Sequence, residues 1–439
     1  MGSNTKGASR VLAIATAAVL AASVTACSSS KSKTSAAGDG KSGGNFTYWS
    51  MWRADEPQAK VIKAAIDAYQ AETGTKVTVE FQGRDVKKKI GPAIAANQAP
   101  DLWDQGSDAI YASVAQSGAA LDLSPVLDMA IPTDNVKVSD AIGTKWLDAL
   151  PKDPNGSNHY VIPYEVASAG LYYNAADPDV SAALASGAPK TWDDFLKVCD
   201  ALKAKSKPCI ASDGELGWEN GLTLDYLLAA QGVDFNALAS DKSGATWDNP
   251  KVLVAAKQME QLVKGGYIAP GYDGTKFPAQ ETNWAAGKSG AFYSDGSWVT
   301  AEVAKQVSST WKMGTILPPG ATNADSMTFG FSIPKKAKNA AAAEKFIAYF
   351  LQKKTLAGIS TDAGNITPRA DIPAPAELAD TQKALNANPV RLTYAGLAGD
   401  WETKAWDTNF LDMWHGKITA EQFVAKVKSD QVAYWKTQG

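Results

Sequence analysis

The sequence predicts an α/β protein with a mainly parallel sheet flanked by helices, and three observations lead to this fold class. A strand, a helix, a strand, a helix and a short strand follow one another over residues 45–103, an order typical of a parallel sheet with helical crossovers. The same rhythm returns later and continues to near the end of the chain. The expected folded part has about 395 residues, which predicts two domains because one core rarely grows beyond about 250–300 residues.

The first elements are predicted from periodicity and from the signals at their ends. Residues 45–51 (NFTYWSM) are aromatic and β-branched, as in a strand. Pro57 begins a helix whose apolar residues fall on one face of 3.6-residue period, and Gly74 ends it. Residues 77–81 alternate between apolar and polar as the next strand, and residues 100–103 (PDLW) form a very short one.

The later helices carry start signals of their own. Thr191 and Asp194 have the spacing of a capping box, and Thr419 and Gln422 repeat it before the last helix. Pro250 begins another helix in this half. The remaining predicted elements are strands at residues 290–293 and 329–333 and a helix at 344–351.

A short apolar run near the N-terminus predicts where the protein works. Residues 11–24 carry no charge and follow two cations, but they are too few for a spanning helix of about 20 residues, so they indicate a signal peptide. The run leads to Cys27 through Val-Thr-Ala, which resembles a bacterial lipoprotein signal. The resemblance implies removal of residues 1–26 and a diacylglyceryl group on Cys27, whose two chains give lasting anchorage. The alternatives are an ordinary secreted protein, cleaved just before this cysteine, or an inert cysteine.

The composition after the signal excludes some partners. Residues 28–44 contain four glycines and no large apolar residue, so they are expected to be a flexible tether. Loss of Lys6 and Arg10 with the signal changes the net charge from −3 to −5. This mild acidity argues against nucleic acid, which needs a basic stripe on its partner. The one basic run, Lys87–Lys89, is interpreted as a solvated helix face.

The cysteines and histidines indicate a disulfide more readily than a metal site. Beyond Cys27, the chain contains Cys199 and Cys209, and an even pair outside the cell suggests a disulfide. Two separate buried thiols are the alternative. His159 and His415 show no ligand spacing with these cysteines, so no metal site and no cofactor are expected.

The motifs of common enzymes are missing from the sequence. Neither histidine has the context of a Ser-His-Asp triad, and the nucleophile-elbow, zinc-protease and phosphate-loop patterns do not occur. A glycoside hydrolase needs two carboxyl groups about 5–10 Å apart, and no motif places two of them so. A membrane-anchored carbohydrate-active enzyme, hydrolase or lyase, therefore remains the second hypothesis. A surface interaction protein without a small ligand is the third.

Seven segments carry a family resemblance through their order and spacing. They are 45–52 (NFTYWSMW), 100–105 (PDLWDQ), 160–174 (YVIPYEVASAGLYYN), 189–195 (PKTWDDF), 284–299 (WAAGKSGAFYSDGSWV), 330–351 (GFSIPKKAKNAAAAEKFIAYFL) and 364–369 (GNITPR). Together they make the chain similar to the family 1 extracellular solute-binding proteins of ABC importers, the maltose-binding-protein-like group. The resemblance covers nearly the whole mature chain, although no segment is specific alone.

The resemblance implies a periplasmic-binding-protein-like fold of two α/β lobes with a ligand cleft between them. A monomer would capture a sugar or oligosaccharide, close around it, and pass it unchanged to ABC permease subunits outside the cytoplasm. Three crossovers would fall near residues 164–166, 329–331 and 366–369. The predicted parts are the signal (1–26), the lipidated cysteine and linker (27–44), lobe 1 (45–164 plus 331–366) and lobe 2 (165–330 plus 367–439).

The first candidate ligand contacts lie at predicted strand ends. Aromatic rings stack on the apolar faces of sugars, and carboxylates or arginines bind the hydroxyls. Trp52 and Asp104 follow or end predicted strands, at the edge where open α/β sheets place ligands. Tyr164 and Glu165 lie at the first expected crossover, where the carboxylate can accept hydrogen bonds from two hydroxyls. Core packing and a hinge salt bridge are the alternatives.

Other candidates come from the second half of the chain. In the resembling family a tryptophan at the place of Trp298 lies under the sugar, and Trp298 is expected to begin a helix. Asp295 is either a site residue or the cap of that helix. Arg369 lies at the third crossover and either faces the cleft or forms a surface salt bridge. Few paired basic residues occur at these positions, which disfavours phosphorylated or strongly acidic ligands. Further candidates are Trp218, Trp284 and Trp401.

Overall fold

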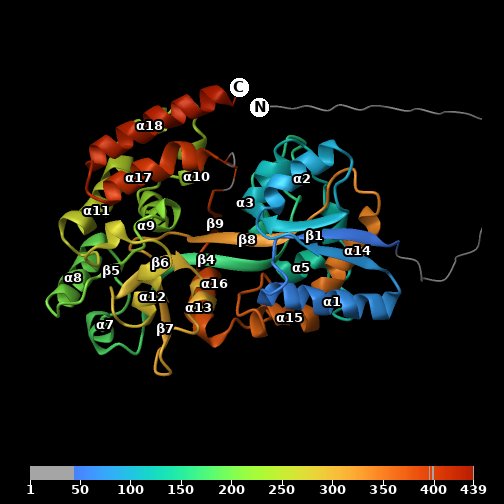
Figure 1. Ribbon diagram of the computed structural model, residues 1–439, viewed down its shortest axis with the longest axis horizontal. Helices are drawn as coiled ribbons and strands as arrows, with labels where there is room; N and C mark the ends of the chain where they lie inside the picture. Colours follow the sequence, from blue (N-terminus) through green and yellow to red (C-terminus); the bar gives the residue numbers. More distant parts are fainter. Residues whose placement is uncertain (1–43, 395, 398–399, 439) are drawn as a thin grey trace, which may run out of the picture. The chain divides into compact units, whose positions relative to one another are not determined.

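The computed structural model describes residues 44–394, 396–397 and 400–438, which are coloured in Figure 1. The predicted signal, Cys27 and the linker up to residue 43 lie outside the described residues. The strands in the described part are β1 (Phe46–Ser50), β2 (Val77–Phe81), β3 (Leu102–Gly106), β4 (Ile162–Asn174), β5 (Ile210–Ala211), β6 (Phe292–Gly296), β7 (Met313–Ile316), β8 (Ala324–Ser332) and β9 (Val390–Leu392).

The α-helices fall into three groups along the chain, separated by the long strands β4 and β8. Before β4 come α1 (Pro57–Thr73), α2 (Val86–Ala95), α3 (Ser107–Ile110), α4 (Ser124–Leu127), α5 (Val138–Ile142) and α6 (Lys145–Asp148). Between β4 and β8 come α7 (Pro178–Ala183), α8 (Trp192–Lys203), α9 (Gly217–Ala230), α10 (Phe235–Ser240), α11 (Pro250–Lys264), α12 (Ala279–Ala285) and α13 (Val299–Glu302). After β8 come α14 (Ala340–Phe350), α15 (Lys353–Thr361), α16 (Ala379–Ala387), α17 (Asp407–Trp414) and α18 (Ala420–Thr437).

The predicted helix signals are confirmed where the structure describes them. Helix α1 begins at Pro57 and ends at Gly74, whose φ of 74° is the left-handed conformation that glycine adopts without strain. The Thr191 side chain accepts a hydrogen bond from the Asp194 amide at the start of α8. A complete capping box begins α18, as its sequence predicts.

The sheet is mixed, which the strand–helix rhythm alone does not predict. Strands β2, β1 and β3 are parallel neighbours, and β5 pairs with β6 in parallel. Strands β4 and β8 add antiparallel ladders, both to each other and to β3, β6 and β7. The resulting order is β2-β1-β3-β8-β4-β6-β5, and β4 and β8 lie side by side through the middle of Figure 1. These two strands therefore connect the two ends of the sheet.

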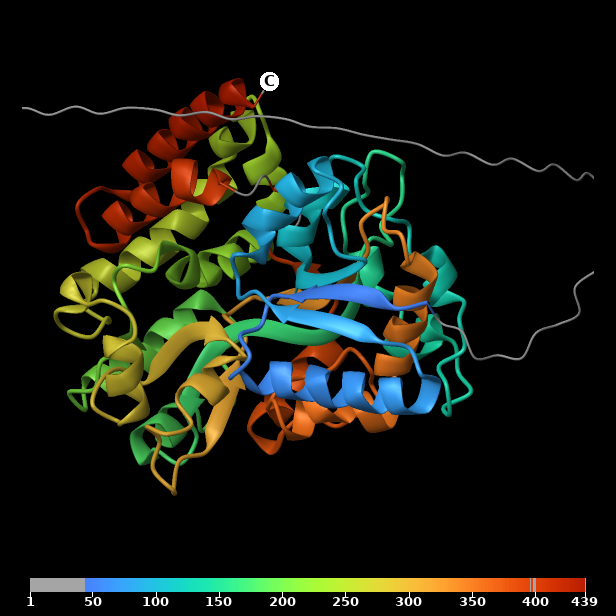
Figure 2. The ribbon, with the colours of Figure 1, turned by 45° about the vertical axis from the view of Figure 1, so that its right-hand side comes forward.

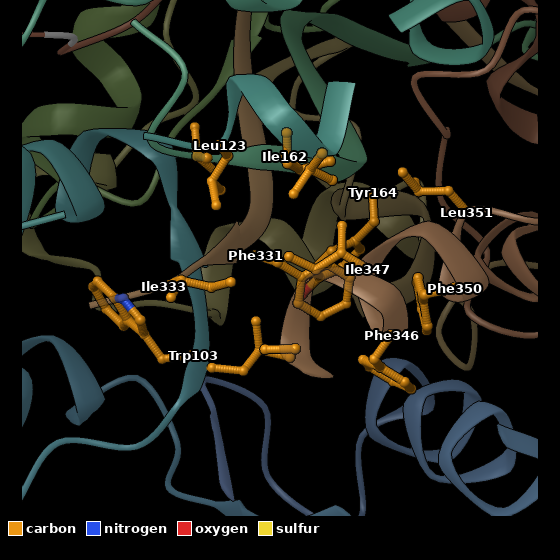
Figure 3. Packing of buried hydrophobic residues seen from close by; sticks show 14 of the residues in the cluster. Trp103, Leu123, Ile162, Tyr164, Phe331, Ile333, Phe346, Ile347, Phe350 and Leu351 are labelled. Atoms are coloured by element: carbon orange, nitrogen blue, oxygen red, sulfur yellow. The ribbon is translucent and has the colours of Figure 1, made fainter. Parts of the chain in front are cut away.

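The first hydrophobic core lies against β1–β3 and the neighbouring ends of β4 and β8. Its centre is aromatic: Tyr164 lies 4.7 Å from Phe331 and 5.5 Å from Phe350 between ring centroids, and Figure 3 shows these rings together. Trp103 is fully buried in the same core, so it fills the sheet face. Helix α1, in blue, lies along one side of β1 and β2 in Figure 2 and contacts α15.

A second core is built around the far end of β4 and β6, and a smaller cluster joins the two regions. The second core contains apolar residues of α8, α9, α11, α17 and α18. Val166 of β4 forms an isolated bridge with Ile366, and both belong to the smaller cluster. Ile372 and Leu392 pack in the first core, so cluster membership does not define lobe boundaries. The three crossovers and the residue ranges of the lobes stay predictions.

The two remaining cysteines are joined in the structure. The sulfurs of Cys199 and Cys209 are bonded at 2.00 Å, so the two cysteines form the predicted disulfide and are not separate thiols. The bond ties the inner face of α8 to the residue before β5, and both cysteines are buried. The disulfide therefore supports the second core and lies away from the predicted strand-end residues.

Candidate solute-binding cleft

Asp104 is buried in the middle of β3, where neighbouring groups satisfy its carboxylate. One oxygen accepts a hydrogen bond from the Met51 amide at 2.6 Å. The other accepts from the hydroxyls of Tyr48 at 2.8 Å, Tyr164 at 2.7 Å and Ser50 at 3.3 Å. Burial raises the pKa of Asp104 to about 6, against the lowering effect of these donors. Asp104 therefore positions Tyr164 and the end of β1 and has little remaining capacity for a ligand.

Trp52 is held between this network and an arginine that the sequence did not single out. Its indole N–H donates to the Tyr164 hydroxyl at 2.7 Å. The guanidinium of Arg84 lies 4.5 Å from the Trp52 ring centroid, a cation–π contact. Both terminal nitrogens of Arg84 donate to Glu56 at 2.9 Å, which fixes the guanidinium in place. Trp52 is almost fully buried, with 4% of its surface exposed.

Glu165 carries an unused hydrogen-bonding atom. It lies in β4 beside an irregularity in the pairing with β8, and it is buried. One carboxylate oxygen accepts a long hydrogen bond of 3.4 Å from Gln58, and the other has no partner. Burial raises the pKa of Glu165 to about 8, and the charge of Arg84 opposes this shift. A buried acceptor without a partner is a place where a ligand hydroxyl is stabilising.

Trp218 and Trp298 form a half-buried aromatic pair. Trp218 lies in the first turn of α9 and Trp298 directly precedes α13, and their ring centroids are 6.0 Å apart. The Trp298 ring lies over Gly296, where an added Cβ would come within 2.2 Å of the ring. Glycine is thus required at the end of β6 for this ring position. The pair presents indole surface of the kind that stacks on a sugar.

Carboxylates gather behind this aromatic pair. Glu219 follows Trp218 in α9, Glu302 ends α13, and Asp295 is the penultimate residue of β6. The Asp295 carboxylate accepts a hydrogen bond of 2.7 Å from the next backbone amide, Gly296, and α13 has no side-chain cap. Asp295 is therefore not the cap of that helix. The strand also begins and ends later than the sequence predicts, which places Asp295 inside it.

A cavity of about 580 Å³ is lined by segments that pack against the first core and by segments that pack against the second core. One wall comes from α2, α3 and the turn after α3, whose apolar residues pack in the first core. The opposite wall comes from the start of α9 and from Tyr394, Leu397, Trp401 and Glu402, and Leu397 and Trp401 belong to the second core. The residues with polar or aromatic groups at this cavity include Lys87, Asp108, Trp218, Tyr394, Trp401 and Glu402.

Four of these cavity residues were not predicted from the sequence. Asp108 follows the carboxyl end of β3, so the rule for ligand positions in α/β sheets was sufficient to find it. Lys87 appeared only as part of a solvated run. Tyr394 lies two residues after β9 and Glu402 begins a short π-helix (Glu402–Trp406), and neither position carries a local motif. Burial raises the pKa of Glu402 to about 8, and Asp108 contributes to this shift from the opposite wall.

Three of the residues predicted to contact the ligand are instead buried or already bonded within the protein. Trp284 is fully buried, stacks on Tyr293 at 5.4 Å and donates to a backbone carbonyl. Arg369 is 3% exposed and is bonded to Asp134, Asp371 and the Leu351 carbonyl, so its guanidinium is already engaged. Trp401 is fully buried and touches the cavity only as part of its wall.

The buried carboxyl groups predict an unusual pH dependence of stability. Burial raises the pKa values of Glu165, Glu219, Glu281 and Glu402 from the ordinary 4.5 to about 8. The folded protein then holds these protons where the unfolded chain has lost them, so stability falls as pH rises through this window. We expect the free energy of unfolding of the ligand-free protein to fall by several kcal/mol between about pH 5 and about pH 9.

Chemical denaturation at a series of pH values measures this loss. The variant Glu165→Gln, which cannot ionise, is expected to flatten the dependence. The prediction fails if the free energy of unfolding of the unmodified protein is constant or rises across this range.

The architecture is the two-lobed fold of the periplasmic solute-binding proteins among solved structures. A family model described as "Bacterial extracellular solute-binding protein" matches residues 64–386, which is most of the chain. The chain belongs to this family, and its members work outside the cytoplasm. Within residues 44–438, apart from the three undescribed positions, no helix has the length and apolar character of a membrane span.

Individual relatives agree with this family assignment. The "Multiple sugar-binding protein" of Streptococcus mutans serotype c is 27% identical over 220 residues, which cover 45% of this chain and 48% of that protein. The chain thus matches about half the length of this curated relative. Among solved structures, the binding protein MsmE of Bacillus subtilis, in an open conformation, has a TM-score of 0.72 at 17% identity, covering 91% of this chain and 99% of that one. RafE in complex with raffinose has a TM-score of 0.66 at 16% identity, covering 89% and 99%. These two likenesses show the fold.

Proposed function

We propose that the protein is the solute-binding component of an ABC importer and captures a sugar or oligosaccharide in the cleft between its lobes. It delivers the ligand unchanged to membrane permease subunits. The observation that carries this proposal is the aromatic pair Trp218–Trp298, which lies beside a cavity with walls from both halves of the chain. Trp218 belongs to both features. Stacking rings with nearby carboxylate acceptors match the apolar faces and hydroxyls of a saccharide.

Glu165 supports the same ligand class from the hinge region. Its unpartnered oxygen is suited to accept a hydrogen bond from a hydroxyl, as predicted from its place in β4. The neighbouring Tyr164 accepts a hydrogen bond from the Trp52 indole and donates one to Asp104. We therefore assign ligand contact to Trp218, Trp298 and Glu165. Trp52, Tyr164 and Asp104 have a supporting role, and Trp284 and Arg369 are left out of the contact set.

The place of action follows from the sequence as well as from the family. We assign a lipid anchor on Cys27, with the protein tethered to the outer face of the cell membrane as a monomer. The relatives named for sugar binding and for a raffinose complex support the saccharide. A Cys27→Ser variant is the appropriate control for anchorage.

An enzyme is the alternative, and the contacts of the histidines do not favour it. The Nδ1 atom of His159 lies 2.8 Å from the Ser124 hydroxyl, but the nearby carboxylate of Asp122 accepts from that serine and not from the histidine. The ring of His415 is bonded to the Gly214 carbonyl at 2.7 Å. Neither arrangement is a serine–histidine–aspartate relay, in which the carboxylate orients the imidazole.

A saccharide panel tests the proposed function. Purified protein is mixed with mono-, di- and oligosaccharides while tryptophan fluorescence and the thermal unfolding midpoint are measured. We expect saturable binding, with about 2.7 kcal/mol of added stability when the ligand is at 100 times its dissociation constant. The ligand is then recovered and analysed for reducing ends. Intact ligand supports the importer component, newly released reducing ends support the enzyme, and no response to any saccharide contradicts both.

A further inference from the structure

We propose that the preferred saccharide carries a positively charged amino group, which binds between the Trp218–Trp298 pair and the carboxylates of Glu219, Asp295 and Glu302. This inference rests on the proposed function and narrows its ligand class. It depends on three features of the described residues. These are unpartnered buried carboxylates, the absence of a cation that neutralises them, and an aromatic surface directly beside them.

The first feature is a group of carboxylate oxygens without hydrogen-bond partners. Glu219, Glu281 and Asp295 are each at most 3% exposed, and each has one oxygen that no donor reaches. They come from α9, α12 and β6, and the α9 and β6 members are linked by a contact from the Ser294 hydroxyl to the Glu219 carbonyl. Buried polar atoms in native proteins are nearly always satisfied. An acceptor cluster of this kind therefore indicates a donor that is supplied from outside the chain.

The second feature is the charge balance of this acidic cluster. Within the described part of the chain, no lysine or arginine forms an ion pair with Glu219, Glu281, Asp295 or Glu302. The groups oppose one another's ionisation, because Glu219 and Glu302 both raise the pKa of Asp295 beyond the effect of its burial. The ligand-free cluster therefore holds protons that a bound cation would displace. A cation beside these carboxyl groups favours their ionised form and is then attracted by each of them, whereas a neutral hydroxyl gains a hydrogen bond and no such charge attraction.

Arg84 is the cation that acts on this region, and it is already engaged. Its charge opposes the burial effect on the pKa of Glu302. However, its guanidinium is bound through both terminal nitrogens to Glu56 and lies over Trp52. The positive charge of Arg84 is thus neutralised mainly by Glu56 and contributes little to neutralising the carboxyl cluster. The site keeps its excess of carboxylates on the α9–α13 side.

The third feature selects an amine from among the possible cations. Trp218 directly precedes Glu219 in the sequence, and Trp298 follows Asp295 by three residues. Both rings are half-buried. Indole faces attract ammonium groups, and aromatic surface combined with carboxylates is the usual recognition of such groups. A metal ion fits this site less well, because the described residues contain no group of three or more His, Cys, Asp or Glu side chains arranged to hold one.

Matched pairs of ligands test the inference. Glucosamine, galactosamine and mannosamine are each titrated beside their neutral parent sugars, and the glucosamine tetramer beside cellotetraose, by calorimetry near neutral pH. We expect at least one amine to bind about tenfold tighter than its parent, a difference of about 1.4 kcal/mol. Added salt should reduce this preference. If no amine binds more tightly than its parent while neutral sugars still bind, the inference is overturned and the proposed function stands.

Variants assign the preference to the cluster. Glu219→Gln and Asp295→Asn are expected to reduce the amine preference to less than about threefold, because they weaken binding of the amine more than binding of its neutral parent. Glu302→Gln, at the exposed end of α13, provides the same test if a buried variant does not fold. Glu260→Gln is the matched control, because Glu260 is a buried carboxylate paired with Lys264 on α11. A preference that survives all three cluster variants overturns the assignment.

A non-sugar amine separates this inference from the function on which it rests. Spermidine is titrated in the same buffer and is expected to bind at least tenfold more weakly than the preferred amino sugar, because it has no ring face to stack. Tight spermidine binding without binding of any saccharide would contradict the proposed function and this inference together.

Discussion

Replacing Trp218 and Trp298 together by alanine is expected to weaken saccharide binding by at least about 100-fold. Each ring offers stacking surface of about 1.5 kcal/mol or more to a bound sugar, and two such losses amount to about 3 kcal/mol. The rings are half-buried and lie next to each other at 6.0 Å, so their removal leaves both hydrophobic cores intact. Calorimetric titration with the best saccharide of the panel measures the loss.

A matched tryptophan separates lost contact from general damage. Trp49 in β1 is also half-buried, but it lines a different cavity beside Asp101 and Asn339. Trp49→Ala should leave the saccharide affinity within about twofold of the original protein. Equal losses in this control and in the double variant would show that the aromatic pair has no special part in binding.

The second large effect is expected in folding. Asp104→Asn should lower the free energy of unfolding by about 3 kcal/mol, because an amide nitrogen cannot accept the hydroxyl hydrogen bonds of Tyr48 and Tyr164. The same change releases Tyr164 from its place beside Trp52. Urea denaturation measures the stability difference, provided that the dependence of the free energy of unfolding on urea concentration is the same for both proteins.

An exposed aspartate provides the comparison for this variant. Asp85 precedes α2 and forms a surface ion pair with Lys88. Asp85→Asn should change the free energy of unfolding by no more than about 0.5 kcal/mol. If Asp104→Asn is as mild as this control, the hydroxyl network contributes little and our account of the end of β1 is wrong.

Much of the fold was predictable because local signals and tertiary packing agree. The alternation in β2, the proline and glycine at the ends of α1, and the capping box of α18 each depend on a few neighbouring residues. The antiparallel placement of β4 and β8 was not predictable, since it depends on partners more than 150 residues apart. The residue patterns of β4 and β8 predict two strands but do not predict whether the strands pair in parallel or antiparallel.

The candidate site was predictable in position and less so in detail. Trp298 and Glu165 were found because they follow or interrupt strands, and the structure places unpaired or half-buried groups there. Asp104 lies at the predicted sheet edge, but its neighbours use its acceptors, and a sequence does not show which way a strand-end side chain points. Tyr394 and Glu402 lie far along the chain from the other cavity residues, and only the tertiary fold brings them to the cavity.

Small-angle X-ray scattering, recorded without ligand and with the saturating saccharide, tests the central claim most directly. A two-lobed protein that closes around its ligand should show a smaller radius of gyration when the saccharide is bound, because the ligand favours the closed state. Trp218→Ala/Trp298→Ala protein should keep the ligand-free value at the same saccharide concentration. An identical scattering curve for the unmodified protein with and without a saccharide that demonstrably binds would contradict capture by closure.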